Sequence, residues 1–304
     1  METAEKKVID LVSVGHSAKR ENRKFPTWHF SMMNDQLRNQ AILESISNLD
    51  LRGKTVFEIG TGAGLIAMYF ARHGTKHVYT CEVDAQLYEI AVRNIRQNKL
   101  EDKITVVHAS SSEYIKSQPK SFKPDIIFTE TLDCGVLGEG YASIAKDIAS
   151  IAHKNTIILP ESIEQFGFLI NSSEIAELNS IANHKEFDLT CINTFSTRSY
   201  FPIRYQMYAS ATMSPVKKLR TYNYREHLDE RSTFTMTVYR SGKCHGIVTY
   251  FHAKFGHSVV TNDVRDSGHW HQAFHPFPQP IEVTTGESYT MVMQNDGSII
   301  PLGN

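Results

Sequence analysis

The sequence predicts an α/β protein in which a parallel sheet with crossover helices precedes an antiparallel β-barrel. Between residues 49 and 160, short β-branched runs alternate with longer helical segments. Beyond residue 160 the apolar runs become short, aromatic and alternating, and one helical pattern interrupts them at about residues 171–186. We therefore expect a helical segment over residues 1–48, the parallel sheet over residues 49–160, and a barrel over residues 161–304 that carries a helical arm.

The expected elements follow from hydrophobic period and from capping or turn residues at their ends. The arm is predicted as a helix over residues 172–182, because an S-x-x-E capping pattern begins at Ser172 or Ser173. The other expected helices cover 65–73, 86–98 and 141–151, and the expected strands cover 54–59, 77–82, 104–108, 125–129, 156–159, 165–170, 231–240, 246–255 and 280–294.

Composition narrows the function classes. The 304 residues include 32 Lys and Arg against 33 Asp and Glu, so the formal charge of −1 gives no overall attraction to nucleic acid or to an anionic membrane. The longest strongly apolar run, residues 65–71, is too short to span a bilayer, and the N-terminus lacks the pattern of a signal peptide. Four widely spaced cysteines without a C-x-x-C pair are typical of a reducing compartment, so we expect a cytoplasmic protein.

A glycine-rich loop follows the first expected strand. Glu58, Gly60, Gly62 and Gly64 lie where a strand turns into a helix, so backbone N–H groups and a helix N-terminus face any bound ligand. A dinucleotide loop would place its third glycine at Leu65, which disfavours NAD. The loop resembles that of class I methyltransferases, which implies a Rossmann-like sheet that binds S-adenosyl-L-methionine.

Two further segments fit the same cofactor. Glu82 ends the second strand, 22 positions after Gly60, where a carboxylate accepts hydrogen bonds from both ribose hydroxyls. Ser112 and Glu113 follow the third strand, and we interpret them either as contacts to the adenine ring or as an exposed loop.

Two glutamates follow the fourth strand. Glu130 and Glu139 bracket the segment TETLDCGVLGEG, residues 129–140. This segment resembles the double-glutamate loop of the protein arginine methyltransferase family, and the arrangement suits a guanidinium, a planar cation with five donors and a pKa above 12. Opposite charges about 4 Å apart attract by roughly 4 kcal/mol at an effective dielectric constant near 20, enough to orient the cation and leave one nitrogen nucleophilic. We assign both glutamates a catalytic role.

Both ends of the chain carry the same resemblance. Residues 28–39, WHFSMMNDQLRN, resemble the helical segment that closes over the cofactor in this family, particularly in its monomethylating members. The resemblance implies that His29 contacts the cofactor, that Met32 packs near the reacting sulfonium, and that Arg38 holds the methionine carboxylate.

Residues 267–272, SGHWHQ, resemble the family's Thr-His-Trp loop. By that match His269 pairs with Asp35 and either holds one glutamate or relays the proton, and Trp270 binds the substrate.

The sequence thus predicts an arginine Nω-methyltransferase, with monomethylarginine as the expected product and a homodimer as the expected assembly. The acceptor is an arginine-containing protein or peptide, or free L-arginine, whose carboxylate would pair with Arg20, Arg23 or Lys24.

Two alternatives stay open. One is an inactive partner subunit that binds the cofactor alone. The other is a metal-binding β-barrel, suggested by His269, His271 and His275. We expect no metal, because no acidic ligand follows at a suitable spacing and because Pro276 and Pro278 are expected to interrupt the strand.

Overall fold

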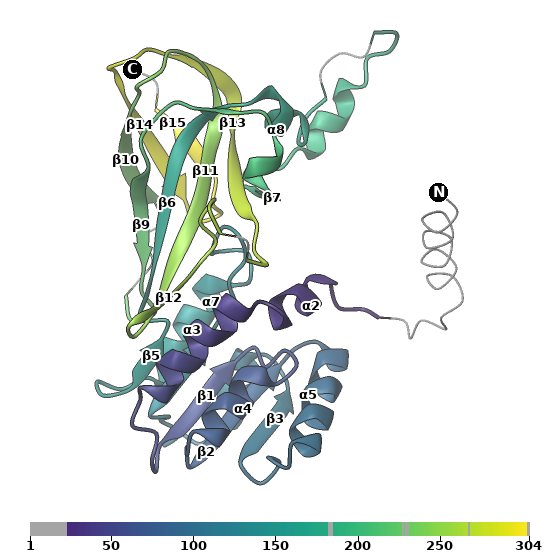
Figure 1. Cartoon of the computed structure of the whole chain (residues 1–304), viewed down its shortest axis with the longest axis vertical. Coiled ribbons are helices and arrows are strands. Elements are labelled where there is room, and N and C mark those ends of the chain that lie inside the picture. The colour runs from purple at the N-terminus through teal and green to yellow at the C-terminus, as the bar shows by residue number, and fades with distance from the viewer. Residues whose placement is uncertain (1–22, 182–184, 227, 229–230, 267, 303–304) are drawn as a thin grey trace, which may run out of the picture.

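The computed structural model describes residues 23–181, 185–226, 228, 231–266 and 268–302. A parallel sheet covered by helices forms one half of the molecule, and antiparallel sheets form the other (Figure 1). The fold class predicted from the sequence is therefore confirmed.

The parallel sheet has the strand order β3-β2-β1-β4-β5. Because β1 lies between β2 and β4, the loops that follow these strands meet at the carboxyl edge of the sheet, where ligands bind in open α/β sheets. This topology brings the glycine-rich loop and the double-glutamate loop (residues 130–139) to one place. The strands are β1 (Thr55–Ile59), β2 (His77–Glu82), β3 (Ile104–His108), β4 (Ile126–Thr129) and β5 (Ile157–Leu159).

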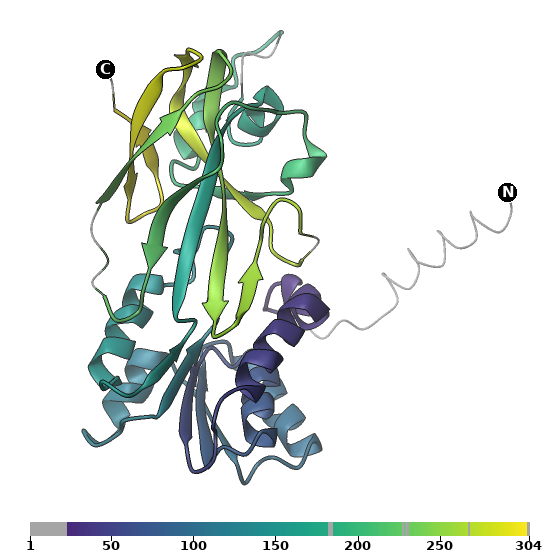
Figure 2. The ribbon, with the colours of Figure 1, turned by 60° about the vertical axis from the view of Figure 1, so that its left-hand side comes forward.

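Side chains that accept hydrogen bonds from free backbone N–H groups fix where several helices begin. Asp84 accepts from the N–H groups of Gln86 and Leu87 at the start of α5, both at 2.9 Å. At the junction between the two halves, α3 packs against the strand β12 (Figure 2). The helices of this half are α2 (Trp28–Met33), α3 (Gln36–Ser47), α4 (Leu65–Arg72), α5 (Ala85–Gln97), α6 (Ser111–Ser117) and α7 (Tyr141–Ile151).

The barrel consists of a sheet in the order β7-β13-β11-β6-β8, which β9 and β12 extend, and a smaller sheet in the order β10-β14-β15. The single strand expected over residues 280–294 is instead the end of β13, a turn and β14. The barrel strands are β6 (Ser162–Asn171), β7 (Phe201–Ile203), β8 (Ala211–Thr212), β9 (Lys217–Tyr222), β10 (Arg231–Thr237), β11 (Gly242–Phe255), β12 (Ser258–Thr261), β13 (Gln272–Val283), β14 (Ser288–Gln294) and β15 (Ile299–Pro301).

Prolines do not interrupt β13, contrary to our expectation for Pro276 and Pro278. Gly246 of β11 pairs with Pro276, whereas Cys244 pairs with Ile281, so residues 277–280 form a wide bulge in the ladder. Pro276 is the last paired residue before the bulge, and Pro278 lies within it, where a proline costs no ladder hydrogen bond.

The arm begins as expected but its helix is shorter. The Ser172 hydroxyl accepts from the N–H of Ile175, which caps α8 (Ser173–Glu177). The side chain of Asn179 then exchanges hydrogen bonds of 2.7 and 2.8 Å with the backbone of Thr197, which ties the chain to its own return path. Ala182, at the end of the predicted helix, lies outside the described residues. The returning chain contains two short 3-10 helices, η1 (Thr190–Phe195) and η2 (Tyr205–Met207), and the arm projects sideways from the barrel (Figure 1).

One hydrophobic core joins the two halves. Phe128 of the parallel sheet packs on Phe255 of the barrel with ring centroids 5.6 Å apart, and Trp270 and Val260 belong to the same cluster. The parallel sheet and the barrel are therefore packed against each other through one shared core.

Candidate functional site

A cavity of about 490 Å³ opens at the carboxyl edge of the parallel sheet. The loops after β1, β2, β3 and β4 line it from below, and α2 and the start of α3 cover it. Its charged lining is mainly acidic: it contains Arg38 and the five carboxylates of Glu58, Glu82, Asp84, Glu130 and Glu139. Such a lining favours cationic ligands.

The glycine-rich loop and Glu82 form the floor of the cavity. The carboxylate of Glu82 accepts from the N–H of Gly62 at 2.8 Å and from the N–H of Asp84 at 2.9 Å, so its orientation is fixed by backbone. Each carboxylate oxygen retains a lone pair for a further donor. A Cβ placed on Gly62 would meet Met32 Cε at 4.0 Å and nothing closer, so the loop is open toward the cavity.

Glu58 lines the cavity but is engaged with protein. Its Oε2 accepts from the Thr80 hydroxyl at 2.6 Å. Complete burial, together with the nearby charge of Glu82, raises the pKa of Glu58 to about 8, against the effect of the hydrogen bond from Thr80. The structure thus places Glu58 in the wall beneath the glycine-rich loop.

The prediction that Glu113 contacts the cofactor is wrong, because Glu113 does not face the cavity. It forms a capping box with Ser110 at the start of α6: the Glu113 carboxylate accepts from the N–H of Ser110 at 2.9 Å, and its own N–H donates to the Ser110 hydroxyl. Ser112 does line the cavity, and its hydroxyl donates to Asp147 of α7 at 2.7 Å. The S-x-x-E spacing is the sequence signal that indicates this cap.

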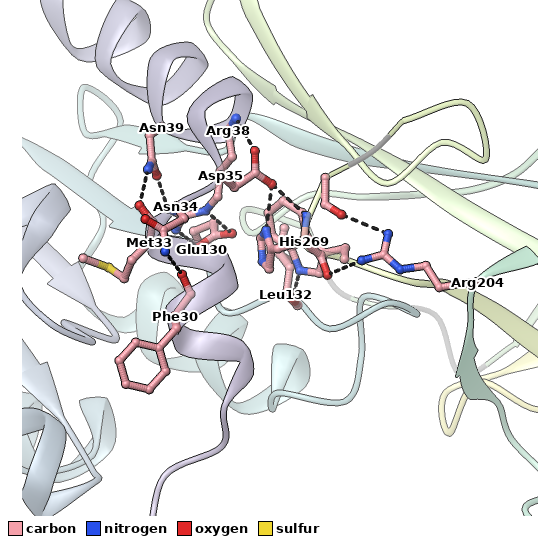
Figure 3. Close-up of polar contacts among 12 residues, drawn as sticks. Phe30, Met33, Asn34, Asp35, Arg38, Asn39, Glu130, Leu132, Arg204 and His269 are labelled. Carbon is pink, nitrogen blue, oxygen red and sulfur yellow. Dashed lines mark hydrogen bonds and ion pairs between the residues drawn. The ribbon is translucent and has the colours of Figure 1, made fainter. Parts of the chain in front are cut away.

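Arg38 and Glu130 form a buried ion pair (Figure 3). Nε of Arg38 donates to Glu130 Oε1 at 3.1 Å, its second donor pairs with Oε2, and the two side chains are 4% and 6% exposed. The third nitrogen of Arg38 donates to Asn39 at 2.7 Å. The expected partner of Arg38 was a cofactor carboxylate, and the structure shows that Glu130 already fixes its guanidinium at the cavity wall.

Glu139 is the second glutamate of the loop, and its exposed surface faces the cavity. Desolvation by the surrounding protein, together with repulsion by Glu130, Asp133 and Glu82, raises the pKa of Glu139 to about 7. Glu139 is exposed, whereas the side chain of Glu130 is only 6% exposed in its pair with Arg38.

The expected pairing of His269 with Asp35 is present (Figure 3). Nδ1 and the backbone N of His269 both lie 2.9 Å from Asp35 Oδ2, while Asp35 Oδ1 accepts from the N–H of Arg38 and so caps α3. Burial opposes the charge on Asp35, but these hydrogen bonds outweigh it and lower its pKa. Burial also lowers the pKa of His269. One carboxylate thus ties the helical segment over the cavity to the barrel.

Trp270 holds the double-glutamate loop instead of binding substrate. Its side chain is 9% exposed, its Nε1 donates to the carbonyl of Leu132 at 2.8 Å, and its ring packs edge-on against Phe251. The predicted substrate contact is therefore wrong, because Trp270 does not line the cavity and packs behind Arg38, whose guanidinium carbon lies 6.0 Å from the centroid of its ring.

The side of the cavity opposite the glycine-rich loop comes from α2. His29 and Met32, which the sequence predicts as a cofactor contact and as a neighbour of the sulfonium, both line the cavity. The ring of His29 stacks on Trp28 at 3.9 Å, and its Nδ1 is buried without a hydrogen-bond partner among the described residues. Such a buried, unpaired nitrogen at a cavity wall is suited to a polar ligand.

Three residues that support the loop were not identified from the sequence. The amide of Asn262 donates to the carbonyl of Cys134 at 3.2 Å, and Asp133 and Tyr200 contact each other beside Gly138. Asp133 lies within the motif, but Asn262 and Tyr200 are distant in sequence, and no spacing or motif indicates them.

The histidines behind the metal alternative do not converge. His275 is fully buried, its Nδ1 lies 2.7 Å from the carbonyl of Gly297, and its Nε2 lies 2.8 Å from the Thr249 hydroxyl. Among the described residues, no group of three or more His, Cys, Asp or Glu side chains is arranged to hold a metal ion.

Within the same residues, no helix is long and apolar enough to cross a bilayer.

The cavity fits a nucleoside-bearing cation. The open backbone at Gly62, the oriented carboxylate of Glu82 and the unpaired Nδ1 of His29 offer acceptors and donors to a ribose and a polar tail. The surplus of carboxylates is complementary to a sulfonium or a guanidinium.

Comparisons with known proteins agree with this site. A family model described as "Ribosomal protein L11 methyltransferase (PrmA)" matches residues 39–159, and one described as "Arginine methyltransferase oligomerization subdomain" matches residues 168–298. The "Arginine N(omega)-methyltransferase" of Streptomyces achromogenes subsp. streptozoticus is 30% identical over 274 residues, which cover 88% of this chain and 76% of that protein. Protein arginine N-methyltransferase 9 of Xenopus laevis is 32% identical over 155 residues, which cover 49% of this chain and 18% of that protein.

Two solved structures show the same fold. One is a Trypanosoma brucei PRMT1 enzyme–prozyme heterotetrameric complex with AdoHcy, with a TM-score of 0.72, 18% identity, and coverage of 88% of this chain and 86% of that chain. The other is Arabidopsis thaliana protein arginine methyltransferase 10, with a TM-score of 0.68, 16% identity, and coverage of 87% and 86%.

Proposed function

This chain belongs to the arginine Nω-methyltransferase family, and from that premise we propose how its acidic cavity transfers a methyl group from S-adenosyl-L-methionine to a guanidino nitrogen. The observation that carries the proposal is the position of Glu139, an accessible carboxylate in the same cavity as the glycine-rich loop and Glu82. Two glutamates of one loop then line the same cavity as the residues expected to bind the cofactor.

The residues that would hold the cofactor are Gly60 and Gly62 through their backbone, Glu82 through the ribose hydroxyls, and His29 and Met32 from above. Gly64, which the sequence also predicted as a cofactor contact, does not line the cavity: it precedes α4 and faces Ala91 and Ile95 of α5. When bound, S-adenosylmethionine supplies an electrophilic methyl group on a sulfonium. Glu58 supports the loop from beneath through Thr80. Ser112 borders the space where an adenine ring would lie.

Glu130 and Glu139 would receive the guanidinium. Arg38 fixes the carboxylate of Glu130, whose oxygens retain lone pairs for a second donor, and Glu139 meets the cation from the other end of the loop. Both carboxylates draw positive charge toward the nitrogens they bind, which leaves the remaining nitrogen more nucleophilic. Most of the rate enhancement then comes from positioning and from exclusion of water.

Methyl transfer releases one proton, because a methylguanidinium keeps its single positive charge near neutral pH. The carboxylate of Glu139, whose pKa is about 7, is suited to accept that proton at an oxygen and pass it to water in the cavity. His269 lines a separate depression together with Asp35 and Arg204. We therefore assign the His269–Asp35 pair to closure of α2 and α3 over the cavity, in preference to a proton relay.

The acceptor is arginine, either in a peptide or as the free amino acid. Arg23 lies near the cavity, with its guanidinium carbon 6.0 Å from the ring centroid of the lining residue Phe25, and offers a cation to an α-carboxylate. Lys24 is exposed beside it, and Arg20 lies outside the described residues.

Mass spectrometry after incubation with S-adenosylmethionine and either free L-arginine or an Arg-Gly-rich peptide tests both the activity and the acceptor. Methylation of either acceptor is the expected result, and the methylated one identifies the acceptor class. Transfer to neither would contradict the proposal and favour an inactive partner subunit.

Monomethylarginine is the proposed product. The support is the resemblance of the segment over the cavity, and of Leu137 to Gly140, to monomethylating relatives. Chromatography of the hydrolysed product after extended reaction tests it, and dimethylarginine formed from a monomethylated acceptor would contradict it.

A homodimer assembled through the arm is the proposed quaternary structure. Leu178, Leu189, Ile192 and Phe195 expose large apolar side chains along the arm, and the arm lies within the match to the oligomerization subdomain. Light scattering on the wild type and on a Phe195→Ser variant tests this. A monomeric wild type would contradict the proposal.

We also propose a cytoplasmic location. Cys81, Cys134 and Cys244 are buried thiols and Cys191 is an exposed one, which fits a reducing compartment. Cell fractionation followed by immunodetection tests this, and recovery outside the cytoplasmic fraction would contradict it.

A further inference from the structure

Asp133 closes the double-glutamate loop from inside. Its Oδ1 accepts from the N–H of Gly135 at 3.2 Å and from the N–H of Gly138 at 3.1 Å, so the chain folds back just before Glu139. Between them, the fully buried Val136 has φ of +79°, a conformation that β-branched residues rarely adopt. The contacts around the loop, and not its local preferences, therefore impose its shape.

Tyr200 reaches this loop from the chain that returns from the arm. A Cβ on Gly135 would lie 2.3 Å from Tyr200 Cε2, and a Cβ on Gly297 would lie 2.4 Å from Cε1 on the other side of the ring. A Cβ on Gly138 would lie 3.1 Å from the Tyr200 hydroxyl. Neither Gly135 nor Gly138 has a left-handed backbone, so these two glycines provide room for the tyrosine.

The hydroxyl of Tyr200 lies beside the Asp133 carboxylate, because a Cβ on Gly138 would be 3.1 Å from that hydroxyl and 2.3 Å from Asp133 Oδ2. Burial raises the pKa of Tyr200, as does the charge of Asp133, so the hydroxyl stays protonated. Burial also raises the pKa of Asp133, against the hydrogen bonds from the N–H groups of Gly138 and Gly135 that lower it. The carboxylate thus joins the loop to the barrel.

We propose that Tyr200 and Asp133 form a latch that sets the position of Glu139, and that both are positioning residues for methyl transfer. The inference rests on the proposed function, because it requires Glu139 to hold the guanidinium. The ring of Tyr200 sets the depth of the loop, its hydroxyl fixes Asp133, and Asp133 fixes the turn that Glu139 follows.

Asp133 also helps to raise the pKa of Glu139. Removal of the Asp133 charge would ease ionisation of Glu139, because Asp133 is one of the carboxylates that repel it. The charged and titratable groups facing Glu139 are Glu130, Asp133, Cys134, Glu82 and Tyr224, with Arg38 held on Glu130.

Two conservative substitutions test the latch. Tyr200→Phe keeps the ring and removes the hydroxyl, and Asp133→Asn keeps an acceptor for the two glycine N–H groups and removes the charge. Tyr239→Phe is the matched control, because it also removes a tyrosine hydroxyl that makes a hydrogen bond, here to Thr212 at 2.5 Å. Tyr239 lies beside the turn that precedes β14, whereas Gly297, which contacts Tyr200, follows the other end of β14.

We expect Tyr200→Phe to lower kcat about tenfold, with the KM values for acceptor and cofactor within about twofold of wild type. We expect Asp133→Asn to move the acidic limb of the pH–rate profile to lower pH. A purely structural contribution would lower the melting temperature without changing kcat per folded enzyme or the acidic limb.

Wild-type kcat in Tyr200→Phe, or an unmoved acidic limb in a folded Asp133→Asn, would overturn the latch while the wild type transfers methyl groups normally. If Asp133→Asn does not fold, the kcat of Tyr200→Phe decides alone. A wild type that methylates neither acceptor would overturn the proposed function, and with it the latch.

Discussion

The two glutamates of the loop should differ sharply in their contribution to stability, although both are needed for activity. Glu130→Gln leaves Arg38 buried beside a neutral amide, because the two side chains are 4% and 6% exposed and paired through two contacts. Loss of one partner of a buried ion pair costs about 3–5 kcal/mol, and the retained amide oxygen places this variant near the lower end.

That cost converts to a measurable shift in melting temperature. An unfolding entropy of about 2.1 cal/mol/K per residue gives about 0.6 kcal/mol/K for the 304 residues. A loss of about 3 kcal/mol therefore lowers the melting temperature by about 5 °C if the chain unfolds in one step.

Glu139→Gln should leave stability unchanged or raise it. The raised pKa of Glu139 means that the folded protein resists its ionisation, so its charge opposes folding above the unfolded pKa near 4.5. This destabilisation is absent below pH 4.5 and grows as the pH rises toward 7. Wild type and Glu139→Gln should accordingly differ most above pH 7 and converge in acid.

Differential scanning calorimetry without added cofactor measures these effects. Glu89→Gln serves as the control, because its ion pair with Arg93 lies on the surface with both side chains more than half exposed, and such a pair contributes at most about 1 kcal/mol. Equal destabilisation by Glu130→Gln and Glu139→Gln would refute the reasoning, as would an unchanged melting temperature in Glu130→Gln.

Three further predictions concern activity and cofactor affinity. The rate constant kcat/KM should fall as the pH drops below about 7, because Glu139 must be ionised to bind the guanidinium, and an acidic limb more than one unit lower would contradict this assignment. Glu82→Gln should weaken cofactor binding about tenfold in calorimetry, whereas Glu113→Gln should not change it, since Glu113 caps α6. Trp270→Phe should lower kcat several-fold with little change in acceptor KM, because it removes the hydrogen bond to the Leu132 carbonyl that holds the double-glutamate loop. A rise in acceptor KM alone would instead support a substrate-binding role for Trp270.

Most elements of the parallel half could be predicted from the sequence, with α6 as the exception, because its residues were interpreted as a cofactor contact or an exposed loop. Strands β2 and β3 and helix α7 have the predicted bounds, because a buried parallel strand reads as an unbroken β-branched run and its helix as an amphipathic one. In the barrel the same reasoning failed at β13, where Pro276 and Pro278 lie at a bulge that depends on the partner strand.

The candidate site shows the same division between local and long-range information. The glycine-rich loop, Glu82 and the two glutamates have local signals, since each follows a strand at a fixed place in this architecture. The ion pair of Arg38 with Glu130 and the contact of Tyr200 with Asp133 join residues 92 and 67 positions apart, and no periodicity predicts such contacts. Glu113 follows β3, which favours a cofactor contact in this architecture, but its S-x-x-E spacing from Ser110 makes it the cap of α6.

The central claim is that Glu139 acts on the guanidinium and not on the cofactor. Single-turnover methyl transfer by wild type and Glu139→Gln, at saturating S-adenosylmethionine and with cofactor affinity measured on the same samples, tests it most directly. We predict transfer by the wild type, none within the same time by Glu139→Gln, and equal cofactor dissociation constants. Transfer by Glu139→Gln at the wild-type rate, or a loss of transfer that follows lost cofactor affinity, would contradict the claim.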